Sequence, residues 1–378
     1  MIVARRFFAQ RRSDWPVFII LVLAGVLALR NLVAVVQFAL HRALQGDFAL
    51  YYVFARIGLH HGFGSLYDLS VQRQEWHAFG PTLFYPYIYP PPLAWLVAPF
   101  AMLPFPVGLG LWSALLAVAL LVTWWLCLPG SRWSVRGAHL AVALAAAPVA
   151  FGLVLGQVVF IVAAAVAIGW WWLRKDRPFS AGVVLALIVL KPQLGFLIPL
   201  ALLAGGRRRA VAGWLAGSGG MLAVCILTLG IGGLATYARR LVEATNALDT
   251  FIVPVKLTLS GLLGQGILAH VAQVVVVVVT LVCCWRRRAD GREFPIAAGL
   301  CASLLVTPFI HTQDLAMLFP AAWLSLRTPW SPFERALGLS GYSASLILAT
   351  PLPLLLVLVG WVPINIGLRR VDRLEKAA

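Results

Sequence analysis

The sequence has few charged residues, because Asp, Glu, Lys and Arg make up only 11% of its 378 residues. A soluble domain has about 25%, so the composition excludes a soluble globular protein. Hydrophobic residues make up 61% of the chain, and many apolar runs reach the roughly 17–25 residues that a membrane span requires. We therefore predict an all-α, polytopic membrane protein with about 10–12 transmembrane helices.

Acidic residues are especially scarce, with 13 Asp and Glu against 30 Lys and Arg. The sequence has no Asp-x-Asp pair to hold a nucleotide-sugar donor through a metal, and no Gly-rich phosphate loop, Walker sequence or Ser-His-Asp signature. The five cysteines lie in or beside apolar runs, without the spacing of a zinc site or a disulfide framework. We predict neither a metal nor a cofactor.

The net charge of +17 does not indicate a nucleic-acid partner, because the basic residues form short clusters between apolar runs. This pattern is typical of cytoplasmic loops that face anionic lipid. With the N-terminus inside, the clusters predict a multi-pass protein of the plasma (inner) membrane, with one transmembrane domain over residues 1–378. Residues 42–91 then form a first extracytoplasmic loop and residues 232–256 a second, and late spans fall near 334–349 and 351–367.

The first loop is predicted to be helical. Residues 48–59 predict a helix with an apolar and aromatic face that suits the membrane surface, and residues 71–79 predict a second, shorter helix. Residues 179–205 carry a basic cluster at each end, so we expect a hairpin with Lys191 and Pro192 at its outer tip.

Asp47 stands at the head of the first loop, directly after the first apolar run. An ionisable residue at a membrane boundary has to be hydrated or paired, and it therefore indicates a functional site. One interpretation is a helix N-cap, since Asp before Phe-Ala-Leu-Tyr-Tyr is good capping sequence. The other is a general base within reach of an acceptor hydroxyl, and the two can hold together.

Other polar residues that interrupt the apolar sequence also fall on the outer side in this topology. The Lys191 ammonium either contacts a phosphate or snorkels to the lipid headgroups. Arg239 and Arg240 break the positive-inside pattern, and they suit either a phosphate group or lipid headgroups. If these groups converge, they line one cavity at the outer membrane face.

Four further polar residues complete the candidate set. Gln157 follows a glycine at an outer turn, where it either hydrogen-bonds sugar hydroxyls or only forms the turn. His311 and Asp314 are three residues apart, so on a helix they face the same pocket wall. Tyr51 belongs to a group of tyrosines that either stack against a sugar or form an interfacial aromatic belt. Gln193 lies two residues after Lys191, at the same hairpin tip.

An ordered series of short motifs resembles glycosyltransferase family 87 over roughly residues 15–330. The series comprises Gly46-Asp47-Phe48, Gly62 to Tyr67-Asp68, Tyr89-Pro90-Pro91-Pro92-Leu93, Gly156-Gln157, Leu190-Lys191-Pro192, and Thr307-Pro308 with His311 and Asp314. Val158 departs from the pattern, since many members carry asparagine after the Gly-Gln pair.

The resemblance implies a fold of the C superfamily (GT-C type), in which the first outer loop carries an acidic catalytic residue that maps to Asp47. It also implies transfer of a sugar, typically mannose, from a polyprenyl-phosphate donor to a glycolipid or glycan acceptor on the extracytoplasmic side. We expect inversion at the anomeric carbon, with Asp47 as the general base. The predicted donor-phosphate contacts are Lys191, Arg239 and Arg240. The predicted substrate-binding residues are Gln157, Gln193, His311, Asp314 and Tyr51.

Two other classes of protein stay open at this point. A transporter or flippase of a lipid-linked saccharide would also gather polar residues beside grooves open to lipid. It would, however, spread them through the depth of the membrane. A non-enzymatic envelope-assembly protein would need neither the outer lysine nor the carboxylate at position 47. The predicted partners are accordingly the sugar donor, the acceptor and membrane lipid, and not nucleic acid.

Overall fold

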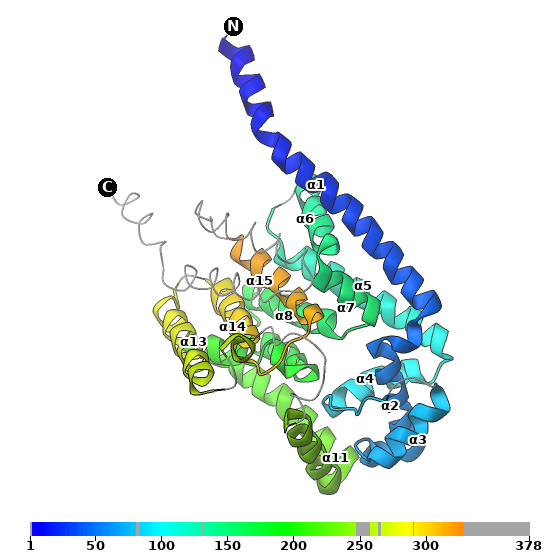
Figure 1. Ribbon diagram of the computed structural model, residues 1–378. Helices are drawn as coiled ribbons and strands as arrows, with labels where there is room; N and C mark the ends of the chain where they lie inside the picture. The colour runs from blue at the N-terminus through cyan, green and yellow to red at the C-terminus, as the bar shows by residue number, and fades with distance from the viewer. Residues whose placement is uncertain are drawn as a thin grey trace.

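Helices make up all the regular structure of the computed structural model over the residues it describes, which are 2–80, 84–130, 132–246, 258–263, 266–289 and 291–327 (Figure 1). Four helices are long and apolar enough to cross a membrane: Phe18–His41 within α1 (Ile2–His41), α5 (Phe105–Cys127), Arg208–Ala244 within α11 (Arg208–Asn246), and α13 (Ile267–Arg286). A bent pair, α6 (Trp133–Ala145) and α7 (Ala147–Leu155), would make a fifth span. The prediction of an all-α, multi-pass membrane protein is confirmed.

The remaining elements are shorter, and several of them are apolar. The predicted spans near 334–349 and 351–367 lie outside the described residues, so the expected total of about 10–12 spans stays a prediction. The α-helices in this group are α2 (Asp47–His61), α3 (Leu69–Phe79), α4 (Pro91–Ala101), α8 (Val159–Arg174), α9 (Pro178–Leu185), α10 (Ile198–Ala204), α12 (Leu259–Leu263), α14 (Glu293–Val306) and α15 (Leu318–Ser325). The 3-10 helices are η1 (Ala43–Gln45), η2 (Phe63–Ser65), η3 (Ala186–Leu190), η4 (Pro192–Leu194) and η5 (Thr312–Met317).

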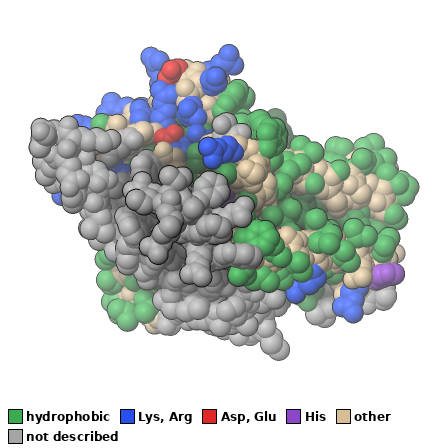
Figure 2. All heavy atoms as spheres, turned by 90° about the horizontal axis from the view of Figure 1, so that it is seen from above, with side chains coloured by type: hydrophobic (Ala, Val, Ile, Leu, Met, Phe, Trp, Pro, Cys, Tyr) green, Lys and Arg blue, Asp and Glu red, His purple; other side chains and the backbone are tan. Residues whose placement is uncertain are grey.

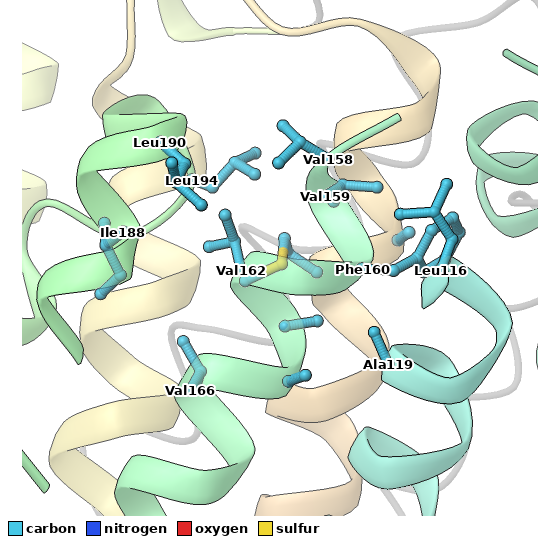
Figure 3. Close-up of a cluster of buried hydrophobic side chains, with 14 of the residues drawn as sticks. Leu116, Ala119, Val158, Val159, Phe160, Val162, Val166, Ile188, Leu190 and Leu194 are labelled. Atoms are coloured by element: carbon cyan, nitrogen blue, oxygen red, sulfur yellow. The ribbon is translucent and has the colours of Figure 1, made fainter. Parts of the chain in front are cut away.

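Helix α8 lies at the centre of the core. It contacts α5, α9, α14, α15, η3 and η5, and its small and β-branched residues are buried on most sides. Figure 3 shows Val162 and Val166 of α8 facing Ile188 of η3, while Phe160 lies beside Leu116 and Ala119 of α5. Because small side chains let helix backbones approach closely, an Ala- and Val-rich helix suits this central place.

Helices α9 and α11 pack backbone against backbone. A Cβ atom added at Gly182 of α9 would lie 1.8 Å from the Ala210 carbonyl oxygen, and one added at Gly213 of α11 would lie 2.0 Å from the Phe179 carbonyl oxygen. Neither distance is compatible with a side chain. The two glycines therefore set the close contact that fixes α9, and with it the segment that ends at Lys191.

The break between α6 and α7 has an identifiable cause. Pro148 lacks the backbone N–H that would bond the carbonyl of Leu144 in a continuous helix, and the two helices meet at an angle of 68°. The Asn31 amide of α1 donates to the Leu144 oxygen at 2.9 Å and to the Ala145 oxygen at 3.1 Å. A polar residue of the first helix thus satisfies the carbonyls that the break exposes, and it fixes α1 against α6 and α7.

Two expectations about the outer loops need correction. The helix at residues 48–59 does not lie on the membrane surface: α2 packs against α4, and Phe48, Tyr51 and Phe54 are buried in the main core. Residues 232–246 are not a loop but continue α11 as a helix beyond a break at Gly230. The remainder of the predicted second loop, residues 247–256, lies outside the described part of the chain.

Several helices run between the same two regions of the molecule. The N-terminal ends of α9 and α11 line one cavity, together with Arg292, the residue before α14, and Leu173 near the C-terminal end of α8. The opposite end of α8 leads to Gln157, the segment from α9 through η3 leads to Lys191, and α14 leads to His311. At 1.5 Å per residue, the 16 residues of α8 span about 24 Å, close to the roughly 30 Å of a bilayer's hydrocarbon core. Pro178 and Gly206 line the same cavity, so the two ends of segment 179–205 lie together. The expected hairpin is therefore present, with Lys191 at its far tip.

Candidate functional site

Asp47 is the first residue of α2, and its side chain turns away from its own helix. Gly46 is the N-cap of α2, and no side-chain capping hydrogen bond forms there, so the interpretation of Asp47 as an N-cap is wrong. Its carboxylate instead accepts a hydrogen bond from the side-chain amide of Gln157. The residue is half-buried. Asp47 is thus held by a contact from a distant part of the chain.

Gln157 is positioned by the turn between α7 and α8. Gly156 ends α7 in the left-handed conformation, with φ of 73°, which favours glycine. The Gln157 N–H then returns to the Gly152 carbonyl at 2.8 Å, and the Trp112 indole N–H donates to the Gly156 carbonyl at 2.8 Å. This turn directs the Gln157 side chain inward, where it is 1% exposed.

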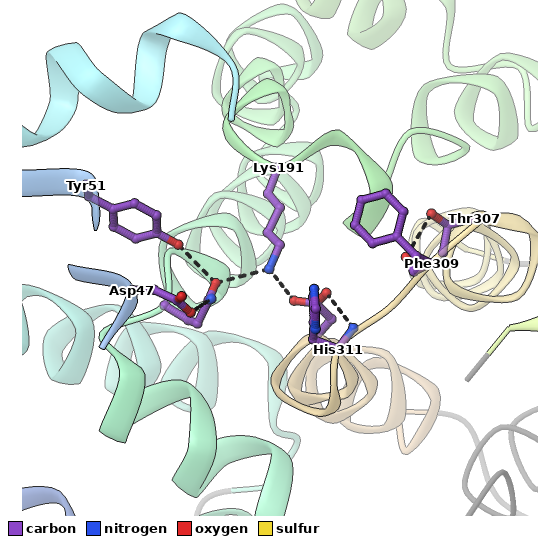
Figure 4. A network of polar contacts seen from close by, with 8 residues as sticks. Asp47, Tyr51, Lys191, Thr307, Phe309 and His311 are labelled. Atoms are coloured by element: carbon purple, nitrogen blue, oxygen red, sulfur yellow. Dashed lines mark hydrogen bonds and ion pairs between the residues drawn. The ribbon is translucent and has the colours of Figure 1, made fainter. Parts of the chain in front are cut away.

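The Gln157 amide links three other groups of the cluster. Its nitrogen donates to Asp47, while its oxygen accepts from the Tyr51 hydroxyl at 3.1 Å and from the Lys191 ammonium at 3.0 Å. An amide turned the other way would put its NH2 group against two donors. The surrounding groups therefore fix its orientation, and one amide connects the carboxylate to the ammonium (Figure 4).

Lys191 lies between η3 and η4, where the following Pro192 disfavours helical backbone and Lys191 adopts φ of −152°. Its side chain is 2% exposed, so the interpretation of a snorkelling lysine is wrong. The ammonium donates to Asp314 Oδ1 at 2.5 Å and forms a buried ion pair with it. Figure 4 shows the ammonium lying between Asp47 on one side and His311 on the other.

Asp314 and His311 come from the segment that follows α14. Asp314 is fully buried, and its second carboxylate oxygen accepts the backbone N–H of His311 at 3.2 Å. Just before them, the Thr307 hydroxyl lies 3.3 Å from the Phe309 carbonyl oxygen, to which it donates. Asp314 thus bonds both the Lys191 ammonium and the start of η5.

Burial and charge act together on the ionisable groups of this cluster. Burial raises the pKa of the Asp47 carboxyl above its ordinary value, although Lys191, Gln157 and His311 work in the opposite direction. Burial alone would lower the pKa of Lys191, but the carboxylate of Asp314 together with Tyr89 and Asp47 raises it, so the ammonium stays charged. Burial lowers the pKa of His311, which favours a neutral imidazole.

The structure brings together six of the nine candidate residues, namely Asp47, Tyr51, Gln157, Lys191, His311 and Asp314. Tyr51 is completely buried, so for this residue the interpretation as part of an interfacial belt is wrong. No metal-binding group of three or more His, Cys, Asp or Glu side chains occurs over the described ranges.

The other three candidates do not contact this cluster within the described part of the chain. Gln193 is half-buried beside Lys191 and makes no hydrogen bond there to described residues. Arg239 is exposed on the second half of α11. Arg240 pairs with Glu243 at 2.5 Å, and its Nε donates to the Tyr67 carbonyl at 3.4 Å.

Two further residues belong to the site: Tyr89, which the sequence offers only as one of several tyrosines for stacking or an aromatic belt, and Trp112, which the sequence does not single out. Tyr89 packs edge-on against Tyr51, with ring centroids 5.1 Å apart, and the Lys191 Nζ lies 5.9 Å from its ring centroid. Trp112 supports the Gly156 turn from the middle of the apolar helix α5. Tyr89 stands next to a proline run that is visible in the sequence, whereas nothing in the sequence distinguishes Trp112 from the other 14 tryptophans.

The family model of glycosyltransferase family 87 matches residues 87–308 of this chain. That stretch is more than half of the 378 residues, and it includes Gln157 and Lys191 but ends just before His311. Asp47 precedes it. No curated protein and no solved structure matches the chain.

Proposed function

Because the chain belongs to glycosyltransferase family 87, we propose that it transfers a sugar from a polyprenyl-phosphate donor to a hydroxyl group of a glycolipid or glycan. The family establishes a membrane glycosyltransferase. The donor class, mannose as the sugar, the acceptor and the roles of individual residues are our proposal. The family assignment also favours a transferase over the transporter and the envelope-assembly protein.

The observation that carries the proposal is the link from Asp47 through Gln157 to Lys191. Displacement at an anomeric carbon needs a base beside the attacking hydroxyl and a cation beside the leaving phosphate. Here a carboxylate and an ammonium bond the two ends of one buried amide. The two groups therefore lie close enough to act on opposite sides of one sugar.

In this proposal Asp47 is the general base. As the acceptor oxygen attacks the anomeric carbon, the bond from that carbon to the phosphate oxygen breaks, and its electron pair leaves with the phosphate. The acceptor proton passes to the Asp47 carboxylate. Burial raises the pKa of this carboxyl, which makes it a stronger base than an exposed aspartate. A single displacement inverts the configuration of the anomeric carbon.

Lys191 is the proposed contact of the donor phosphate. Gln157 and Asp314 account for two of its three N–H donors, and the third is available to a phosphate oxygen. An ammonium fixed in a site with little water stabilises the charge on the leaving group without first having to reorganise. Gln157 and Asp314 are positioning residues for this lysine, in addition to their proposed contact with substrate.

The other candidates take more peripheral parts. Arg240 contacts Tyr67, which belongs to an aromatic group that continues through Tyr87 to Tyr89 beside Lys191. We propose that Arg239 or Arg240 meets the donor phosphate from this side. Tyr51, Gln193 and His311 then contact the sugar or the acceptor.

We propose that the site faces the outside of the plasma membrane. The supporting observation is the arrangement of the helices, since α8 separates Gln157 from the arginine-rich end of the molecule by about 24 Å. Arginine-rich ends favour the cytoplasm, so the opposite end, with Asp47 and Lys191, falls on the extracytoplasmic side.

The test is a donor panel with purified protein in lipid. The protein is incubated with polyprenyl-phosphate mannose, with polyprenyl-phosphate arabinose and with nucleotide sugars, each radiolabelled, together with envelope extract as the source of acceptors. We expect label transfer from a polyprenyl-phosphate sugar and an inverted linkage in the product. Transfer from nucleotide sugars alone, or retention of configuration, would contradict the proposal.

A further inference from the structure

A second polar site lies at the opposite end of the molecule from Asp47 and Lys191. It is a cavity of about 320 Å³ lined by Leu173, Asp176, Pro178, Gly206, Arg207, Arg208, Arg209 and Arg292. We call it the basic pocket. Four arginines and one aspartate leave it strongly positive. The glycosyltransferase mechanism uses none of these residues.

Two of the arginines are held in place within the basic pocket. Arg292 donates to Asp176 at 2.5 Å and also to the Leu173 carbonyl. Arg207 donates to the Arg288 carbonyl at 3.5 Å, but its Nε is buried and has no hydrogen-bond partner among the described residues. A buried N–H without a partner costs free energy, and an anion bound in the adjoining cavity would stabilise this guanidinium through its charge.

The other two arginines are available to a ligand. Arg208 and Arg209 are exposed and form no ion pair with any described residue. A guanidinium presents parallel N–H donors that match the oxygens of a phosphate. Since Asp176 is already paired with Arg292, its carboxylate offsets only part of the positive charge.

The backbone adds to this positive potential. Helix α11 begins at Arg208 and helix α9 begins at Pro178, so the N-termini of both helices border the basic pocket. The first N–H groups of a helix have no partner within the helix, and its dipole favours an anion there. These features add to the arginines and the buried Nε rather than define the site alone.

The position of the basic pocket indicates where its ligand comes from. It lies beside the C-terminal end of α8. The N-terminal end of α8, next to Gln157, is about 24 Å away, the length of the helix. Seen from above, Lys and Arg side chains gather on part of the molecular surface, beside large hydrophobic areas (Figure 2). Basic pockets between membrane helices at the cytoplasmic side suit the headgroups of anionic lipids.

We propose that the basic pocket binds the phosphate of an anionic phospholipid from the cytoplasmic leaflet. Arg208 and Arg209 contact the phosphate oxygens, and Arg207 and Arg292 complete the positive wall. The bound headgroup bridges the starts of α9 and α11 and so stabilises the packing of the hairpin that carries Lys191. The inference does not depend on which sugar the enzyme transfers.

Native mass spectrometry of the full-length, delipidated protein in detergent tests this proposal. The protein is titrated with phosphatidylglycerol and, separately, with phosphatidylcholine. We expect phosphatidylglycerol to bind at least about tenfold more tightly, which corresponds to ~1.4 kcal/mol. In the Arg208→Ala/Arg209→Ala variant this preference should be lost, while Arg208→Lys/Arg209→Lys should retain most of it because the charges remain.

The matched control is Arg132→Ala/Arg286→Ala, which removes two exposed arginines that do not line the basic pocket. It should keep the preference for phosphatidylglycerol. Equal losses in the control and in the pocket variant would overturn the proposal, because attraction would then depend on total charge. A further arm adds inorganic pyrophosphate: binding of pyrophosphate without any preference for phosphatidylglycerol would show a site for a free phosphate and would overturn the lipid assignment.

Discussion

The buried ion pair between Lys191 and Asp314 allows a quantitative test of the site's structure. The two side chains are 2% and 0% exposed, and Nζ lies 2.5 Å from Oδ1. The Lys191→Met substitution keeps the length and the apolar stem of the side chain but removes the charge. It leaves the Asp314 carboxylate buried without its cation.

The expected cost follows from this burial. Removing one partner of a buried pair costs about 3–5 kcal/mol, because the remaining charge is left uncompensated. At about 2.1 cal/mol/K per residue, a loss of ~4 kcal/mol in a chain of 378 residues lowers the melting temperature by about 5 °C. The Lys191→Met/Asp314→Asn variant removes both charges, so we expect it to recover at least ~2 kcal/mol of the summed single losses.

Thermal unfolding of all variants in the same detergent provides the measurement. Lys175→Met is the matched control, because Lys175 is an exposed lysine whose only described partner is the Trp171 ring at 5.7 Å. It should cost less than about 1 kcal/mol. If Lys191→Met lowered the melting temperature no more than Lys175→Met, or if the effects of Lys191→Met and Asp314→Asn were additive, the buried pair would not exist as described.

Three further predictions concern packing, donor binding and pH. Gly182→Ala should destabilise the protein by about 1–3 kcal/mol or more, because its Cβ would collide with the α11 backbone, whereas Gly219→Ala, with open space around it, should be neutral in the same unfolding assay. Arg239→Ala/Arg240→Ala should raise the KM for the polyprenyl-phosphate donor in steady-state assays with little change in kcat; an unchanged KM would remove these arginines from the site. A base acts when deprotonated, and burial raises the pKa of Asp47 above its ordinary value of 3.8. In the pH profile of the transfer rate, kcat should therefore fall on acidification with a pKa above 3.8. An acidic limb with a pKa at or below 3.8 would contradict the assignment.

The sequence predicts the meeting of six polar residues that the structure brings together, but it also places Gln193, Arg239 and Arg240 with them, and these do not contact the cluster within the described ranges. Basic clusters predict the sidedness of each loop, and this prediction places Gln157, Lys191 and His311, which all interrupt apolar sequence, on one side. The contacts then follow from the ends of α8, η3 and α14 lying together. The partner of Lys191 could not be predicted in this way, since Asp314 is 123 residues away and nothing local distinguishes pairing from exposure to lipid headgroups.

The expectations that failed depended on burial rather than on sidedness. An aromatic-rich helix such as α2 has the same composition whether it lies on a membrane or packs in a core. Only its contacts with α4 decide between the two. Residues 232–246 contain charged residues that suggest a loop, but they continue α11 as a helix, because helical backbone tolerates an exposed, charged surface. The capping interpretation of Asp47 failed because Gln157 bonds its carboxylate.

The most direct test of the role of Asp47 compares the Asp47→Asn enzyme with wild type in single-turnover transfer and in equilibrium donor binding. The substitution keeps the shape of the side chain and an oxygen acceptor for Gln157 while removing the base. Asp68→Asn is the control, since Asp68 is an exposed aspartate in the same loop that caps α3. We predict that Asp47→Asn slows transfer by at least about 100-fold with donor affinity within about twofold of wild type, and that Asp68→Asn keeps full activity. Transfer by Asp47→Asn at a rate within a few-fold of wild type would contradict the account.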